Sequence, residues 1–137
     1  MKTPYQIVAE HYAASDRQDL AGMLADASPE VRWTEMAGFP CAGTHVGPQA
    51  VVEQVFRRLG AEWDGYRFRL GALYDAGDTV VATGDYAGTC RATGRSFEAR
   101  VAHVWQVAQG RIVAFEQFTD TLLVHRAMAA PADGYGG

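Results

Sequence analysis

The sequence has only two cysteines, and they form no recognisable pair. Cys41 and Cys90 are far apart, and neither belongs to a CxxC motif or a cysteine-rich framework. Disulfides are typical of oxidising compartments, where small secreted domains use several of them. We therefore expect two buried thiols in a reducing compartment.

Positive charge is also scarce and scattered. The chain has 12 Lys and Arg against 16 Asp and Glu, which gives a formal net charge of -4 at pH 7. A protein that binds nucleic acid needs a basic surface to meet the phosphate backbone. We therefore expect no nucleic-acid partner.

Long apolar runs are missing as well. None approaches the roughly 18 residues that a membrane-spanning helix needs. Residues 1–6 also lack the apolar core of a secretory signal. We expect a cytoplasmic protein that makes no contact with a membrane.

The common motifs for metals and nucleotides are absent. His11, His45, His103 and His125 form no HxH, HxxxH or Cys-His pair at the spacing of metal ligands. The chain also has no P-loop, no GxGxxG segment and no nucleophile elbow. We predict no metal and no cofactor.

What the chain does have is ordinary globular composition. It has 137 residues, of which 48% are hydrophobic and 20% charged, a size and balance typical of one folded domain. We expect a single domain over residues 1–130. The glycine-rich tail, 131–137, has little apolar mass and is predicted to be disordered.

The first half of the sequence favours helices. Thr3 can cap a helix that starts at Pro4, and Gln6 completes a capping box, so a helix is predicted from residue 4 to about 14. Asp16 is expected to cap a second helix over 16–25. A third is predicted from Pro48 to Gly60, after a loop at 38–47.

The second half favours strands. Alternating residues predict a short strand at 31–36, and tight turns separate longer strands at 66–74, 79–89, 96–107 and 111–121. Helices followed by strands joined by tight turns indicate an α+β fold in which helices cover an antiparallel sheet. Residues 101–105 are apolar on both faces, which favours burial of the outer face by a second copy of the chain.

Five short segments follow one another in a recognisable order. They are Trp33-Thr34-Glu35, Gly43-Thr44-His45-Val46-Gly47, Ala102-His103-Val104-Trp105, Gly110-Arg111-Ile112 and Gln117-Phe118-Thr119-Asp120-Thr121. Together they resemble the SnoaL-like branch of the nuclear transport factor 2-like superfamily, which also contains ketosteroid isomerases, polyketide cyclases and limonene epoxide hydrolases. The resemblance spans residues 4–128.

The resemblance implies a fold and a kind of ligand. The fold is a cystatin-like α+β barrel, a conical curved antiparallel sheet wrapped around three helices from the N-terminal half of the chain. It encloses a deep pocket, and such proteins are usually dimers. The implied partners are a hydrophobic small molecule and a second copy of the chain.

The catalytic residues that the resemblance implies are only partly present. SnoaL-type cyclases have an aspartate base on the last strand, where this chain has Gln117. The epoxide hydrolases also need that last-strand aspartate, together with an Arg and an Asp two apart on an earlier strand. Thr83 and Asp85 occupy those two places, so the Arg is absent. An amide cannot abstract a proton, so neither chemistry is supported in its usual form.

Ketosteroid isomerases resemble the chain in another way. Their carboxylate base, helix-one tyrosine and oxyanion-binding acid fall near Glu35, Tyr12 and His103, which are our candidate catalytic residues. Asp120 is the only acid in the second half of the last predicted strand, and the resemblance assigns it a structural role. The candidate substrate-binding residues are Trp33, Phe56, Trp63, Trp105, Phe115, Gln117 and Thr119.

Two of these assignments have a plain structural alternative. Glu35 is either a buried pocket carboxyl, which could exchange protons at neutral pH, or a charge in solvent at the end of its strand. His103 is either a catalyst or a hydrogen-bonded core residue. Two functions therefore remain open: a cofactor-independent isomerase or cyclase for a carbonyl compound, and a binding or assembly module without catalysis.

Overall fold

The computed structural model describes residues 1–129. It is an α+β fold in which one curved sheet of six strands encloses helices on its inner face. The strand order is β2-β1-β6-β5-β4-β3, and the sheet does not close, because β2 and β3 remain as edges. The tail predicted to be disordered lies outside the described residues.

The N-terminal helices form as their caps predict, with one shift. Helix α1 (Pro4–Asp16) begins with the capping box: the Thr3 hydroxyl accepts from the Gln6 amide at 3.1 Å, and the Gln6 side chain accepts from the Thr3 amide at 2.9 Å. The second helix was predicted too long. It is only α2 (Leu20–Met23), and Asp19 caps it rather than Asp16, because α1 continues through Asp16.

The third helix is continuous but irregular. It consists of α3 (Pro48–Val51), a π-helical stretch η1 (Val52–Phe56) and α4 (Arg57–Glu62). Gly60 does not end it, contrary to the prediction. The helix contacts β1 and β2 at its start and β3 at its end, so it covers the gap between the two sheet edges.

Four long strands form the predicted antiparallel series. They are β3 (Trp63–Ala76), β4 (Thr79–Cys90), β5 (Ser96–Ala108) and β6 (Arg111–Thr119), each paired with the next. The short strand β1 (Ala27–Glu35) pairs with β6 in parallel, so the sheet is not entirely antiparallel. This pairing joins the first and last strands of the chain and places Trp33 beside Phe115.

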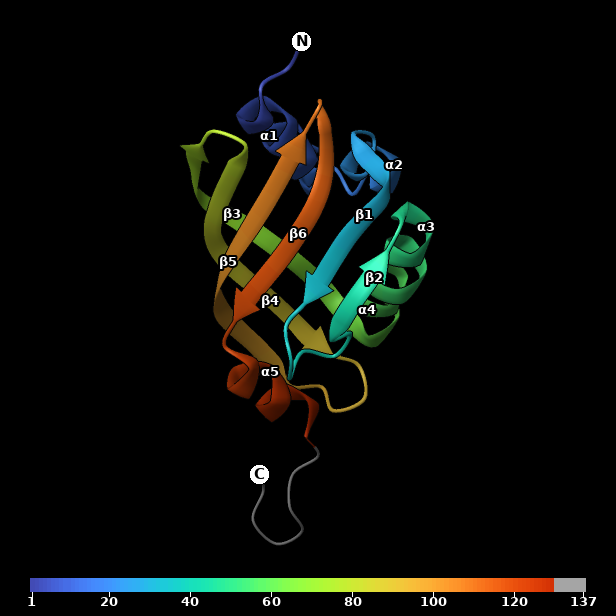
Figure 1. Ribbon diagram of the computed structural model, residues 1–137. Coiled ribbons are helices and arrows are strands. Elements are labelled where there is room, and N and C mark those ends of the chain that lie inside the picture. Colours follow the sequence, from blue (N-terminus) through green and yellow to red (C-terminus); the bar gives the residue numbers. More distant parts are fainter. Residues whose placement is uncertain (130–137) are drawn as a thin grey trace, which may run out of the picture.

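Two elements were not predicted. Strand β2 (Gly43–Val46) was expected to be loop, and it pairs with β1 as an exposed edge strand. Helix α5 (Thr121–Met128) follows β6, which ends at Thr119, two residues earlier than expected. Figure 1 shows α5 at the end of the sheet opposite the N-terminus, where it contacts β5 and β4.

Asp120 caps α5. Its carboxylate accepts a hydrogen bond from the Leu123 amide at 3.3 Å. Capping of this kind satisfies an amide that has no partner within the helix. Asp120 therefore has the structural place that the resemblance implied.

We expect Asp120→Ala to lower the free energy of unfolding by about 1 kcal/mol, since the cap is lost, while Asp120→Ser retains most of it. Urea unfolding at neutral pH measures the difference. Equal stability of the alanine variant and the unsubstituted protein would contradict this role for the cap.

Candidate functional site

A cavity of about 730 Å³ opens between α1, α4 and the inner face of the sheet. Most of its walls are aromatic and apolar, and this volume lies within the range of pockets for small organic molecules. At its mouth are Ser15, Asp16, Gln18 and Arg67. The deeper part is formed by β1, β4, β5 and β6.

Seven of the ten predicted site residues line this cavity. Strand alternation explains several of them, because His103 on β5 and Phe115 on β6 occupy inward-facing positions. The π-helical stretch ends in Phe56, which packs edge-on against Trp33 with ring centroids 5.5 Å apart. The seven are Tyr12, Trp33, Glu35, Phe56, Trp63, His103 and Phe115.

Trp105 and Thr119 do not line the cavity. Trp105 is fully buried behind it, and its indole nitrogen donates to the Tyr12 hydroxyl at 2.9 Å. The Thr119 hydroxyl donates to the carbonyl oxygen of Arg100 at 2.9 Å. Neither side chain is placed to touch a ligand, so a substrate-binding role for them has no support in the geometry.

Gln117 is also buried behind the cavity wall. Its amide nitrogen donates to the Tyr86 hydroxyl at 2.9 Å, and its amide oxygen accepts from the Met36 backbone at 3.3 Å. Both ends of the amide are therefore engaged within the protein. Gln117 therefore contacts Tyr86, which lines the cavity.

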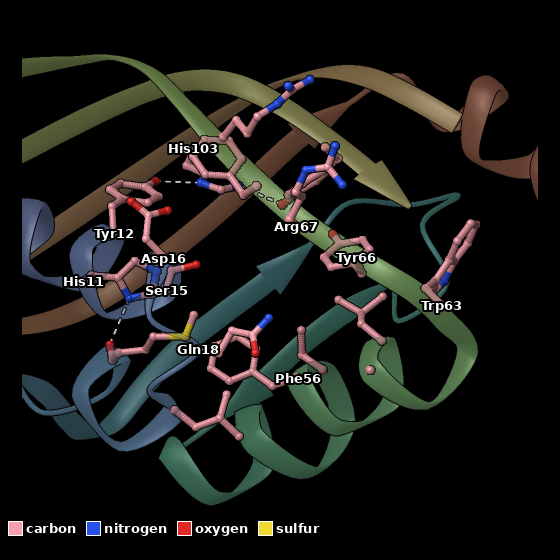
Figure 2. A pocket seen from close by; sticks show the side chains of 18 of the residues that line it. His11, Tyr12, Ser15, Asp16, Gln18, Phe56, Trp63, Tyr66, Arg67 and His103 are labelled. Atoms are coloured by element: carbon pink, nitrogen blue, oxygen red, sulfur yellow. Dashed lines mark hydrogen bonds between the residues drawn. The ribbon is translucent and has the colours of Figure 1, made fainter. Parts of the chain in front are cut away.

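His103 connects two tyrosines that both line the cavity. Its Nδ1 lies 2.6 Å from the Tyr12 hydroxyl and its Nε2 lies 2.7 Å from the Tyr86 hydroxyl. Figure 2 shows the first of these bonds reaching from α1 to β5. Burial, with a smaller contribution from His11, holds the pKa of His103 well below its usual value. The ring is thus neutral and hydrogen-bonded on both sides.

Glu35 is buried at the end of β1, with 3% of its surface exposed, so the solvent-exposed alternative does not hold. The Cys41 thiol donates to its Oε1 at 3.7 Å, and its Oε2 is buried with no hydrogen-bond partner. Burial raises the pKa of this carboxyl from 4.5 to about 8, and the Cys41 bond opposes that shift.

Two tyrosines near Glu35 were missed by the sequence analysis. Tyr66 and Tyr86 line the cavity with ring centroids 5.3 Å apart, and the buried Tyr66 hydroxyl has no hydrogen-bond partner. Burial is the main cause that raises the pKa of both phenols; the next cause is Tyr86 and then Glu35 for Tyr66, and Glu35 for Tyr86. Inward alternation along β4 was the available signal for Tyr86, whereas a positive-φ Gly65 and a register shift disrupt that signal at Tyr66.

His11 also lines the cavity, although the sequence analysis did not name it as a site residue. Its Nδ1 lies 2.9 Å from the Met23 carbonyl oxygen, which can only accept, so the proton is on Nδ1. Burial lowers the pKa of His11 to about 4. The ring is therefore neutral. Within residues 1–129, no group of three His, Cys, Asp or Glu side chains could hold a metal ion.

The raised pKa of Glu35 has a consequence for stability. Between pH 4.5 and about 8 the unfolded chain releases this proton and the folded chain keeps it, so the free energy of unfolding falls as pH rises. The loss is about 1.4 kcal/mol per pH unit. We expect Glu35→Gln to remove this slope, so that the variant gains on the unsubstituted protein between pH 5 and 8. Urea unfolding at several pH values measures it.

The matched control is Glu53→Gln, which changes an exposed glutamate on the π-helical stretch η1. It should keep the original pH dependence. Parallel stability curves for Glu35→Gln and the unsubstituted protein would show that the Glu35 carboxyl titrates normally.

Known proteins resemble this chain in sequence and in fold. The model of the SnoaL-like domain matches residues 8–115. A nuclear transport factor 2-like protein from Burkholderia thailandensis E264 is 67% identical, with a TM-score of 0.93, and the match covers 94% of this chain and 99% of that one. TerC, crystallised with polyporic acid, shares the fold at 23% identity, with a TM-score of 0.82 and coverage of 92% and 98%.

A curated relative is longer. Patulin synthesis protein F of Aspergillus clavatus is 31% identical over 96 residues, which are 68% of this chain and 48% of the relative, so the match spans about half of that protein. The family model covers most of the described residues, and the 67% identical structure has the same architecture throughout. The chain therefore belongs to the SnoaL-like domain family.

Proposed function

We propose that this protein is a cofactor-independent acid–base catalyst, an isomerase or cyclase for a hydrophobic compound that contains a carbonyl group. The observation that supports this proposal is the state of Glu35. This residue lines an aromatic cavity, and its buried carboxyl has one oxygen without a hydrogen-bond partner. With a pKa of about 8, roughly one molecule in ten is ionised at pH 7, and the rest hold a proton that can be returned.

The reaction that suits this arrangement is a proton shift beside a carbonyl. The Glu35 carboxylate removes a proton from the carbon next to the carbonyl group, and the charge moves to the carbonyl oxygen. A hydroxyl of Tyr12 or Tyr86 donates to that oxygen, and the aromatic walls exclude water. Glu35 then returns the proton to a different carbon, which completes an isomerisation. Alternatively, the enolate carbon attacks a second carbonyl of the same molecule, which closes a ring, and Glu35 returns its proton to the alkoxide oxygen that forms.

The ligand in this proposal accepts more hydrogen bonds than it donates. The indole nitrogen of Trp33 is buried without a partner and can only donate. A protonated Glu35 donates through its acid proton, and the Tyr66 hydroxyl is also unpartnered. A compound with two or more carbonyl oxygens and an apolar body satisfies these groups.

We expect Glu35→Gln to lower the exchange of carbon-bound hydrogen by 10²- to 10⁴-fold, since an amide cannot take the proton. The assay incubates the protein in D₂O with a panel of polyketide-like and steroid-like enones and detects deuterium uptake by mass spectrometry. As a base, Glu35 also predicts a kcat/KM that rises about tenfold per pH unit and levels off above pH 8.

Glu53→Gln is again the matched control and should exchange hydrogen at the original rate. A profile that falls through pH 8 would assign Glu35 the role of an acid rather than a base. Undiminished exchange by Glu35→Gln would remove Glu35 from the mechanism.

A binding module without catalysis is the second candidate. One observation favours it: the last-strand position expected to hold an aspartate base has Gln117, whose amide is engaged on both ends. In the same panel, this candidate predicts a compound that raises the melting temperature of the protein without deuterium uptake.

We also propose a homodimer that forms through the outer face of the sheet. Tyr74 on β3 and Phe118 on β6 are exposed there, and Val81 and Val104 lie between them, half-buried. An exposed apolar patch of this kind is typical of an interface.

The residues that the structure describes include no helix long and apolar enough to cross a membrane.

We expect Phe118→Asp to convert the dimer to a monomer, because it places a charge in a patch that the dimer buries. Light scattering coupled to size exclusion measures the mass. Leu122→Asp, at an exposed position on α5, is the control and should leave the dimer intact. A monomeric unsubstituted protein would contradict the proposal.

The cytoplasm is the proposed location, since both cysteines are free thiols.

A further inference from the structure

Five buried side chains form one hydrogen-bonded row, and both of its ends are fixed donors. The indole nitrogen of Trp105 can only donate, and it donates to the Tyr12 oxygen. At the other end the amide nitrogen of Gln117 donates to the Tyr86 oxygen. The orientation of that amide is set by the Met36 backbone N–H, which donates to its oxygen. Both tyrosine oxygens therefore already accept one bond.

His103 fills the middle of the row and touches both hydroxyls, at 2.6 Å through Nδ1 and at 2.7 Å through Nε2. The ring is buried, and burial keeps its pKa well below the usual value, so it has one N–H and one bare nitrogen. Two hydroxyl protons and one ring proton are available, and each of the two O···N contacts holds one of them. One proton is left over.

The left-over proton has two possible places. If the ring proton is on Nε2, it is donated to Tyr86, Tyr12 donates to Nδ1, and the Tyr86 proton is free. If the ring proton is on Nδ1, the roles reverse and the Tyr12 proton is free. Both tyrosines line the cavity. We infer that the tautomer of His103 selects which of the two tyrosines, Tyr12 or Tyr86, presents its hydroxyl proton to a ligand.

This inference rests on the proposed function in one respect: the free hydroxyl is the donor for the carbonyl oxygen of the substrate. His103 itself does not contact that oxygen in this scheme. It is a positioning residue that acts through the tyrosine next to it.

Exchange between the two arrangements needs a carrier in the cavity. One proton leaves Tyr86, the ring proton passes from Nε2 to Tyr86, the Tyr12 proton passes to Nδ1, and another proton joins Tyr12. The proton count and the charge are unchanged if a water or a ligand hydroxyl takes the first proton and supplies the last. A ligand oxygen next to Tyr12 and another next to Tyr86 can thus each receive a hydrogen bond, one after the other.

Nitrogen NMR of the full chain labelled with ¹⁵N-histidine tests the inference, because protonated and bare ring nitrogens have well-separated chemical shifts. We expect Tyr12→Phe to place the proton on Nε2. In that variant the Tyr86 oxygen can still accept from Nε2, whereas a proton on Nδ1 would have lost its acceptor. We expect Tyr86→Phe to place the proton on Nδ1, because only the Tyr12 oxygen then remains to accept it. The two variants should show opposite tautomers.

His103→Gln identifies the signals of this ring among the four histidines. Tyr5→Phe, which changes an exposed tyrosine on α1 outside the row, is the control and should leave the spectrum as it is in the unsubstituted protein. The same tautomer in both row variants would overturn the inference. So would a ring protonated on both nitrogens at pH 7 in the unsubstituted protein, a result that needs no variant to fold.

The experiment contains no substrate, so its outcome is independent of catalysis by Glu35. Opposite tautomers in a protein that exchanges no hydrogen would leave this inference in place and remove the proposed reaction. Full exchange activity with a single fixed tautomer would do the reverse.

Discussion

The buried row of Trp105, Tyr12, His103, Tyr86 and Gln117 is the constraint on which the interior of this protein depends. Five polar side chains deep in a core are tolerated because each has a partner, and an unpaired group there costs about 1–3 kcal/mol. The row joins α1 to three strands, β4, β5 and β6. It thereby fixes how the helix sits against the sheet and keeps two tyrosine hydroxyls at the cavity wall.

Glu35 stands in contrast to that row. Each polar side chain of the row has at least one partner within the protein, whereas the Glu35 carboxyl has a weak thiol donor on one oxygen and nothing on the other. Trp33 and Tyr66 also have unpaired polar atoms, and all three residues line the cavity. Among the described residues, three of the four buried side-chain atoms without a partner belong to residues that line the cavity, and Glu62 Oε1 is the fourth. A ligand in the cavity can supply partners for those three.

The sequence predicts those parts of the fold that depend on local signals. The Thr3 capping box and the alternation along β5 require only neighbouring residues, and both are confirmed. The parallel pairing of β1 with β6, the edge strand β2 and helix α5 depend on contacts between distant segments or on patterns too short to detect. The site divides in the same way: Glu35 and His103 follow from alternation and resemblance, whereas the link from Gln117 through Tyr86 to His103 appears only once the strands are in register.

The central claim is that Glu35 holds a proton at neutral pH and can release it in the cavity. A ¹³C NMR titration of the Glu35 side-chain carboxyl, identified by its absence in Glu35→Gln, tests this most directly. The account predicts a single transition with a midpoint near pH 8. A midpoint near 4.5, the ordinary value for a glutamate, would show a carboxylate that is already ionised and would contradict it.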